Sequence, residues 1–144
     1  MKYLADTNFL SELLKRRPNP GVMRWLLSVD ENDIAVSVIT LGELQRGASR
    51  LRPGDRQSRL QTWIDQYIIP RFSGRLIGIG MAEMLEWGTR YGRFERQGRP
   101  RAVLDSLLAI TALTNDLAVV SRNVRDLDDW GVPVINPWND ENGA

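Results

Sequence analysis

Short apolar runs alternate with helix-forming segments along the chain, and this alternation constrains its fold more than any other feature. Runs rich in Val, Ile, Leu and Ala predict buried strands at residues 2–5, 34–38, 117–120 and 132–135, with a weaker candidate at 75–79. Apolar residues at helical spacing predict helices at residues 9–14, 20–29, 40–51, 56–67, 81–96 and 102–114. Buried strands that alternate with helices are typical of an α/β protein with a mostly parallel sheet, and we predict that fold class.

The chain has 144 residues and carries no linker, internal repeat or low-complexity run. We therefore expect one domain over residues 1–139 and a short C-terminal tail at 140–144. No apolar stretch is long enough to span a membrane. Asp6 interrupts the N-terminal segment before the apolar region of a signal peptide could form, so we expect a cytoplasmic protein that does not contact a membrane.

The absence of histidine and cysteine narrows the chemistry that the chain can perform. It excludes Ser-His-Asp and Cys-His nucleophile systems, disulfide bonds, and metal sites that depend on Cys or His ligands. Any catalytic site must use carboxylates, hydroxyls, amides or basic side chains. A bound metal would be a hard cation held through oxygen, with Mg²⁺ or Mn²⁺ as the leading candidates.

Polar side chains suited to such a site follow several predicted strands, and ligands of parallel sheets bind beyond the carboxyl ends of the strands. Three acids fall at that edge: Asp6 after the first strand, Glu43 in the helix after the second, and Asp105 near the start of a later helix. Neighbouring polar candidates are Thr7, Asn8, Ser121, Asn123 and Asp126. The three acids are far apart in sequence, and we expect them to converge on one edge of the sheet.

Each of these acids also has a purely structural interpretation. Asp6 or Thr7 can cap the first helix, and Thr40 to Glu43 fits a capping box. Asp105 suits the positive end of a helix dipole. Three converging carboxylates nevertheless repel one another, and a divalent cation relieves that repulsion. Mg²⁺ held by a few carboxylates acts on phosphates, so the set of acids favours phosphate chemistry.

Five segments of the sequence, taken in order, resemble PIN-domain proteins. They are LADTNFLSEL at 4–13, VSVITLGELQRG at 36–47, DSLLAITAL at 105–113, VVSRNVRDL at 119–127 and VINPW at 134–138. Within that family the sequence is most similar to the VapC/FitB-type toxins of bacterial type II toxin–antitoxin systems. The resemblance covers nearly the whole chain.

The resemblance implies a Rossmann-like, mostly parallel central sheet flanked by helices, and an Mg²⁺-dependent ribonuclease in which Mn²⁺ can replace Mg²⁺. It also implies a homodimer that is held inactive by a cognate antitoxin and reaches DNA only through that antitoxin. By position, the first three catalytic and metal-binding acids of the family correspond to Asp6, Glu43 and Asp105. Its supporting polar residues correspond to Thr7, Asn8 and Ser121.

The sequence departs from the family pattern at the fourth acidic position. Asn123 stands there, and the nearest acid is Asp126. Asn123 can offer an amide oxygen to a metal or a water molecule, and Asp126 can contribute from the next turn. Both are candidates for the fourth catalytic residue, and the choice between one and two bound metal ions stays open.

Arginine dominates the basic residues, because only Lys2 and Lys15 of the 19 are lysine. Arginine suits bidentate phosphate contacts and stacking on bases, although genomic base composition produces the same bias. Two arginine clusters supply the candidates for RNA binding, which are Arg46, Arg50, Arg99 and Arg101. A solvated surface or the docking of an acidic antitoxin segment would explain the clusters equally well.

We therefore predict metal-assisted hydrolysis of RNA phosphodiester bonds. Asp6 and Asp105 would bind the cation directly, and Glu43 would be a further ligand or would orient a water molecule. The alternative is a non-catalytic protein of the same fold that acts by binding RNA or its antitoxin.

Overall fold

A five-stranded sheet lies at the centre of the protein in the computed structural model, which describes residues 1–139. The strands are β1 (Tyr3–Ala5), β2 (Ile34–Ser37), β3 (Leu76–Ile77), β4 (Ala118–Val120) and β5 (Val134–Ile135). They lie in the order β3-β2-β1-β4-β5, and all four pairings are parallel. The predicted α/β class is confirmed, whereas the predicted tail at 140–144 lies outside the described residues.

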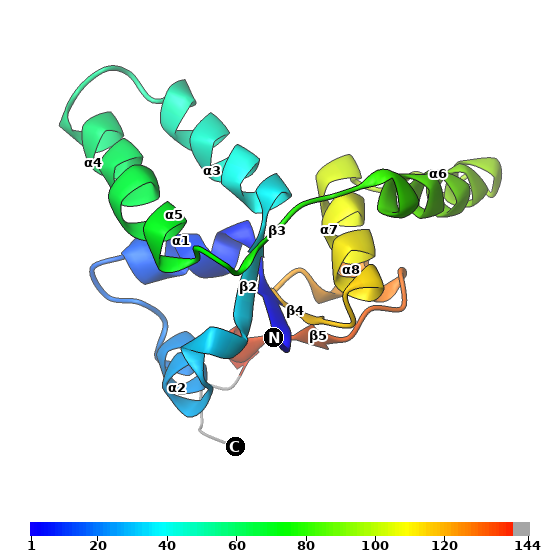
Figure 1. Cartoon of the computed structure of the whole chain (residues 1–144), viewed down its shortest axis with the longest axis horizontal. Helices are drawn as coiled ribbons and strands as arrows, with labels where there is room; N and C mark the ends of the chain where they lie inside the picture. Colours follow the sequence, from blue (N-terminus) through cyan, green and yellow to red (C-terminus); the bar gives the residue numbers. More distant parts are fainter. Residues whose placement is uncertain (140–144) are drawn as a thin grey trace.

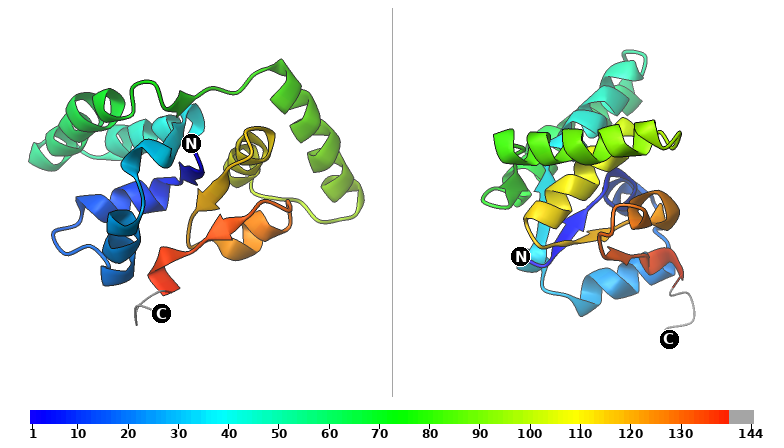
Figure 2. Two further views of the ribbon diagram at one scale, coloured as in Figure 1. Left: turned by 60° about the horizontal axis from the view of Figure 1, so that its bottom comes forward. Right: turned by 90° about the vertical axis from the view of Figure 1, so that its right-hand side faces the viewer.

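Helices lie on both sides of this sheet (Figures 1 and 2). The α-helices are α1 (Thr7–Leu14), α2 (Pro20–Ser28), α3 (Val38–Arg50), α4 (Asp55–Trp63), α5 (Ile69–Arg71), α6 (Met81–Arg96), α7 (Val103–Thr114) and α8 (Val124–Asp128). The other helical segments are the 3-10 helices η1 (Glu31–Asp33) and η3 (Pro137–Asn139) and the π-helical η2 (Ile64–Ile68). Among residues 1–139, no helix combines the length and apolar character needed to cross a membrane.

Alternate residues of the strands enter two separate hydrophobic cores, as the period of a strand requires. Leu4, Ala35 and Val119 pack with apolar residues of α7 and α8. The next residue of each of these strands packs with α1, α2, α3 and η2 in the other core. All five tryptophans are buried in these cores or packed against them, as expected for side chains of that size.

The order of strand addition reverses between β1 and β4. β2 and β3 extend the sheet on one side of β1, and β4 and β5 extend it on the other. In sheets of this kind a crevice outside the carboxyl ends of the strands, at the point of reversal, binds ligands. Asp6 directly follows β1 and Ser121 directly follows β4, so the fold places both side chains at this point.

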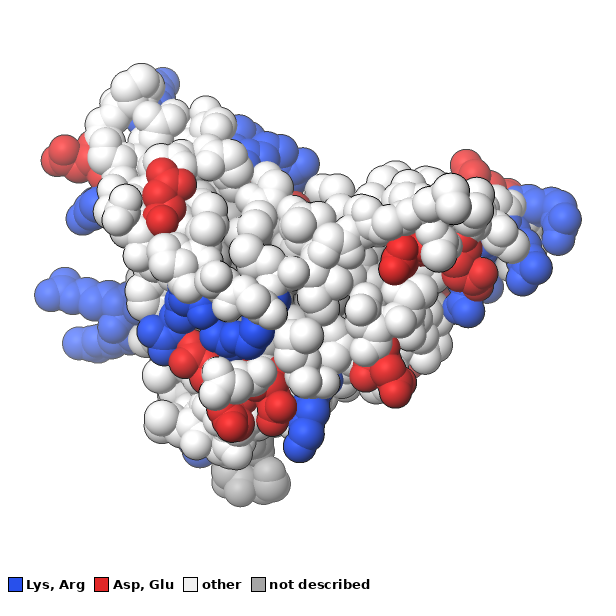
Figure 3. Space-filling view, in the orientation of Figure 1, with Lys and Arg blue, Asp and Glu red and all other residues white. Residues whose placement is uncertain are grey.

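A notch separates two parts of the molecular outline in the space-filling view (Figure 3). Comparison with Figure 1 identifies these parts as the one formed by α3 and α4 and the one formed by α6. Basic side chains on this face gather in several separate places instead of one continuous patch (Figure 3).

The predicted capping box at Thr40 is wrong, because α3 begins two residues earlier at Val38. Ser37 is the N-cap, and its hydroxyl accepts a hydrogen bond from the Ile39 amide at 3.0 Å. Ser37 and Thr40 are both good capping residues, and the earlier one occupies the position where the strand ends. Glu43 therefore lies in the second turn of α3, free of a capping role.

The predicted helix at 56–67 is longer than expected and passes through Pro70 to Arg71. A proline ring normally clashes with the carbonyl four residues earlier and breaks a helix. Here the π-helical η2 directly precedes Pro70, so the residues before the ring do not follow the regular α-helical hydrogen-bond pattern. The strand candidate at 75–79 shortens to Leu76–Ile77 beside Gly78.

Candidate active site

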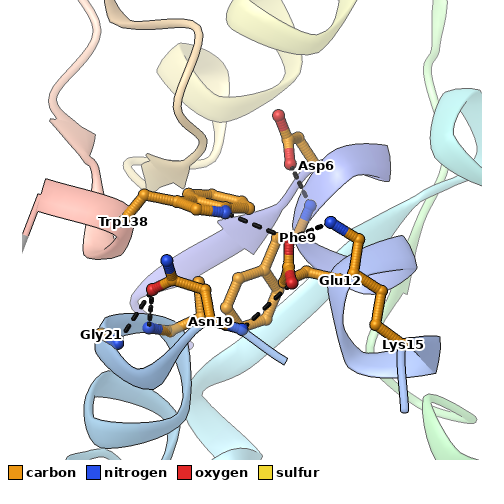
Figure 4. Close-up of polar contacts among 8 residues, drawn as sticks. Asp6, Phe9, Glu12, Lys15, Asn19, Gly21 and Trp138 are labelled. Carbon is orange, nitrogen blue, oxygen red and sulfur yellow. Dashed lines mark hydrogen bonds and ion pairs between the residues drawn. The ribbon is translucent and has the colours of Figure 1, made fainter. Parts of the chain in front are cut away.

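Asp6 is the most buried of the predicted site acids, at 7% exposed. It is the N-cap of α1, where its Oδ1 accepts a hydrogen bond from the Phe9 amide at 2.7 Å (Figure 4), and Ser121 hydrogen-bonds the same carboxylate. Burial raises the pKa of Asp6 above its ordinary value of 3.8. The negative charges of Asp105 and Glu43 raise this pKa further, whereas the two hydrogen bonds lower it. Asp6 is therefore a buried acid that two other carboxylates repel.

Asp105 lies in the first turn of α7 and contacts the loop that follows β4. The Nδ2 of Asn123 donates a hydrogen bond to Asp105 Oδ2 at 2.8 Å. Burial raises the pKa of Asp105 above its ordinary value of 3.8, the negative charge of Asp126 raises it further, and the Asn123 hydrogen bond lowers it. Both candidates for the fourth position thus lie near Asp105, with Asn123 in direct contact.

The loop between β4 and α8 connects the two buried acids. Ser121 is fully buried, and its Oγ accepts a hydrogen bond from the Asn123 amide at 2.9 Å. Ser121 contacts Asp6, and Asn123 contacts Asp105. This one loop therefore holds the acid after β1 and the acid of α7 in fixed positions.

Glu43 is half-buried on α3 and is held from α1. The Oγ1 of Thr7 donates a hydrogen bond to Glu43 Oε1 at 2.9 Å. Because Thr7 follows Asp6 directly, this bond connects Glu43 to the end of β1. Asn8 is exposed, and no hydrogen bond joins its side chain to these acids within the described part of the chain.

Glu43 also borders a hollow of about 280 Å³ at the start of α3. The hollow is lined by Val38, Ile39, Gly42, Glu43, Arg46 and Leu104. Its lining is mostly apolar, and it brings the cationic Arg46 next to an acid of the site.

The carboxylate oxygens of this site are of the kind that hard divalent cations bind. Within residues 1–139, no three acidic side chains converge tightly enough to form a ready-made metal cage. Asp105 and Glu43 nevertheless repel the buried carboxylate of Asp6. A bound divalent cation would relieve that repulsion. Asp6 also makes no salt bridge with another residue of this part of the chain.

The predicted RNA-binding arginines differ in whether they form salt bridges within residues 1–139. Arg99 and Arg101 both form salt bridges with Asp129, at 3.4 and 2.7 Å, and both lie over the Phe94 ring. Arg46 borders the acidic site, and Arg50 is exposed one turn further along α3.

Arg122 also lies beside the site, although it is not among the arginines that the sequence predicted to bind RNA. It stands between Ser121 and Asn123, and its guanidinium lies 5.1 Å from the centre of the Trp138 ring. A single arginine in a loop has no periodicity or motif spacing by which the sequence could identify it. What sets Arg122 apart is its contact with a tryptophan that is distant in sequence, and only the structure shows that contact.

The fold and the acids at the strand ends define a known class of protein. Residues 3–130 match the family model described as the PIN domain. The chain therefore belongs to the PIN-domain family, and within it to the VapC/FitB-type toxins, as the sequence motifs predicted.

Similar proteins cover nearly the full length of the chain. It is 32% identical to Toxin FitB of Neisseria gonorrhoeae over 137 residues, which are 95% of this chain and 99% of that protein. It is 26% identical to VapC ribonuclease Y4jK of Sinorhizobium fredii, over 94% of this chain and 96% of that protein. A structure of FitAB bound to a DNA fragment matches with a TM-score of 0.85 at 30% identity, over 94% of this chain and 95% of that one.

Proposed function

We propose that this protein is a metal-dependent endoribonuclease toxin that hydrolyses RNA phosphodiester bonds at the site formed by Asp6, Glu43 and Asp105. The observation that carries the proposal is the environment of Asp6, which is buried at the strand-order reversal and repelled by the other two acids. A relative of nearly equal length named as a VapC ribonuclease supports the reaction class.

In this proposal, Asp6 and Asp105 hold Mg²⁺, or Mn²⁺ in its place, and Glu43 is a further ligand or orients water. A bound divalent cation would lower the pKa of an attacking water molecule and would place a positive charge beside the phosphate. Ser121 and the Phe9 amide keep the Asp6 carboxylate in place through their hydrogen bonds.

The remaining polar contacts orient the other two acids. Asn123 holds Asp105, and Thr7 holds Glu43. Because the chain has no histidine, proton transfer would use either a hydroxide supplied by the metal or a side-chain carboxylate. Glu43 is the candidate carboxylate, since it borders the open hollow at the start of α3.

We further propose that the toxin binds a cognate antitoxin, that it forms a homodimer, and that it reaches DNA only through the antitoxin. The structure of the related FitAB bound to DNA supports a complex of this kind. We also propose that residues 1–139 act as one domain.

The test is cleavage of single-stranded RNA by the purified chain without its antitoxin. We expect cleavage with Mg²⁺ or Mn²⁺, none with EDTA, and products that carry 5′-phosphate and 3′-hydroxyl ends. RNA that stays intact under every metal condition while it binds the protein would instead support the non-catalytic alternative, for which the asparagine at the fourth position is the specific reason.

A further inference from the structure

We propose that Arg122 binds a phosphate group of the RNA chain next to the acidic site, with the indole ring of Trp138 as its platform. The proposal rests on the proposed ribonuclease function and adds a substrate contact to the same site. The position of Arg122, the unused donors of its guanidinium and the rigidity of the Trp138 ring support this contact.

The backbone of Arg122 is fixed on both sides by residues of the site. Ser121 hydrogen-bonds Asp6, and Asn123 hydrogen-bonds Asp105. The Asn123 amide also donates to the Ser121 hydroxyl across Arg122, which closes this part of the loop. The exposed side chain of Arg122 therefore starts from a defined point at the rim of the acidic site.

The guanidinium of Arg122 is held by an aromatic ring and not by an acid. It lies 5.1 Å from the centre of the Trp138 ring, and within residues 1–139 it forms no salt bridge. Stacking on a ring leaves the N–H donors of a guanidinium available. Arg99 and Arg101 provide the contrast, because they also lie over a ring but direct their donors to Asp129.

The platform itself is rigid. Trp138 is 8% exposed, and its Nε1 donates a hydrogen bond to Glu12 Oε1 at 3.2 Å (Figure 4). Glu12 is itself buried and also accepts hydrogen bonds from the Lys15 ammonium at 3.0 Å and the Asn19 amide at 3.1 Å. Phe9 packs edge-on against the indole. The guanidinium thus stacks on a ring that several contacts hold in place. Because the Arg122 side chain is already ordered, it loses less conformational entropy when an anion binds.

The ligand that fits this arrangement is a phosphate of the substrate. The carboxylates of the site repel a polyanion, and a cation on the same loop offsets that repulsion. The planar fork of a guanidinium matches two phosphate oxygens. An RNA chain has a phosphate at every nucleotide, so a chain bound at the acids carries further phosphates close to the site, and Arg122 is placed to bind one of them.

The experiment measures binding apart from cleavage. Affinity of the full chain for a fluorescent single-stranded RNA is measured in EDTA from about 50 to about 200 mM salt, for wild type, Arg122→Ala and Arg122→Lys. Arg125→Ala is the matched control, because it removes an exposed arginine from the adjacent helix α8. Circular dichroism confirms that each variant is folded.

We expect Arg122→Ala to weaken binding about tenfold at low salt, the loss typical of one charge-assisted hydrogen bond. The slope of log affinity against log salt should fall by about 0.7, the value for one phosphate of a single strand. Arg122→Lys should recover the slope but only part of the affinity, and Arg125→Ala should stay within about twofold of wild type.

Equal affinity and equal slope for Arg122→Ala and wild type would overturn the assignment. It would also be overturned if Arg122→Ala bound RNA as wild type does but lost binding to a poly-glutamate peptide, because Arg122 would then bind an acidic protein segment instead of RNA. If the wild type cleaves RNA with Mg²⁺ while Arg122→Ala behaves identically, only the role of Arg122 fails. If the wild type neither binds nor cleaves RNA, the proposed function fails as well.

Discussion

The carboxylate of Asp6 is buried at the end of β1 and faces the negative charges of Asp105 and Glu43, and these conditions raise its pKa above 3.8. An acid with a raised pKa in the folded state stabilises the fold fully below its unfolded pKa. That contribution is lost as the pH rises through the folded pKa. Asp6 therefore destabilises the metal-free protein at neutral pH, although we propose that it is essential for metal binding.

Asp6→Asn should accordingly raise the free energy of unfolding at pH 7 in EDTA, and the gain should disappear below pH 3.8. Asparagine caps helices about as well as aspartate, so the bond to the Phe9 amide can persist. Urea unfolding at several pH values measures the effect. A variant less stable than wild type at pH 7 would contradict this interpretation.

Thr40 carries a buried hydroxyl with no hydrogen-bond partner in residues 1–139. Thr40→Val removes this unsatisfied group and should raise the free energy of unfolding by about 1 kcal/mol. Thr111 is the control, since it is also fully buried but donates its hydroxyl to the Leu107 carbonyl at 2.8 Å. Thr111→Val should lower stability by about 1 kcal/mol in the same urea titration. A loss of stability in both variants would show that Thr40 has a partner after all.

Among the helices, α1 is joined to the cap of α2 and to η3 by Glu12. Burial alone would raise the pKa of Glu12, but hydrogen bonds from Lys15, Asn19 and Trp138 outweigh it and lower the pKa below 4.5. The stabilisation is therefore present above pH 4.5 and is lost as the pH falls through the lowered pKa.

Glu12→Ala should lower the free energy of unfolding at pH 7 by about 2 kcal/mol, because it removes the acceptor of the half-buried Asn19 amide and of the buried Trp138 indole N–H. Glu95→Ala on the exposed surface of α6 is the control and should change it by less than about 0.5 kcal/mol. Chemical denaturation compares the two variants. Equal small effects would mean that Glu12 does not join these elements.

The elements predictable from sequence are those whose pattern is long or apolar enough to be unambiguous. Buried strands such as β2 and helices such as α7 have this property. The helix α8 was missed because five residues carry no helical period, and the passage through Pro70 depends on the π-helical turns before it. Hydrophobic periodicity reports burial, whereas these features arise from local backbone geometry.

The candidate site was predictable in part for a similar reason. Asp6, Glu43 and Asp105 could be placed at one edge because strand ends converge in a parallel sheet. The contacts that hold them, from Thr7 and Asn123, depend on loop conformation. Strand and helix patterns contain no information about that conformation.

On the scale of the whole molecule, one group of exposed apolar side chains lies where three helices begin. Val38 starts α3, Met81 and Leu85 lie in the first half of α6, and Val103 starts α7. Unlike an isolated exposed group such as Leu27, exposed apolar groups that lie together mark interaction surfaces, and here Met81 is 80% exposed and Leu85 is 66% exposed. These residues are the surface on which we expect the proposed homodimer to form.

Arg46 and Arg50 lie on α3, and Glu83, in the first turn of α6, forms no ion pair within residues 1–139. A two-fold axis can therefore bring α3 of one copy against α6 of its partner. Leu85→Glu should convert a dimer into a monomer of 16.4 kDa in sedimentation analysis. Leu27→Glu, on the exposed surface of α2, should leave the dimer intact. A monomeric wild type, or a dimeric Leu85→Glu, would contradict this prediction.

The central claim is that these acids catalyse metal-dependent RNA cleavage, and the most direct measurement is the cleavage rate as a function of Mg²⁺ concentration. Wild type, Asp6→Asn, Asp105→Asn and the exposed control Asp128→Asn on α8 are compared. We predict a rate that rises with Mg²⁺ for wild type and Asp128→Asn, and rates at least about 100-fold lower for Asp6→Asn and Asp105→Asn. Undiminished cleavage by folded Asp6→Asn, or wild-type cleavage that persists in EDTA, would contradict it.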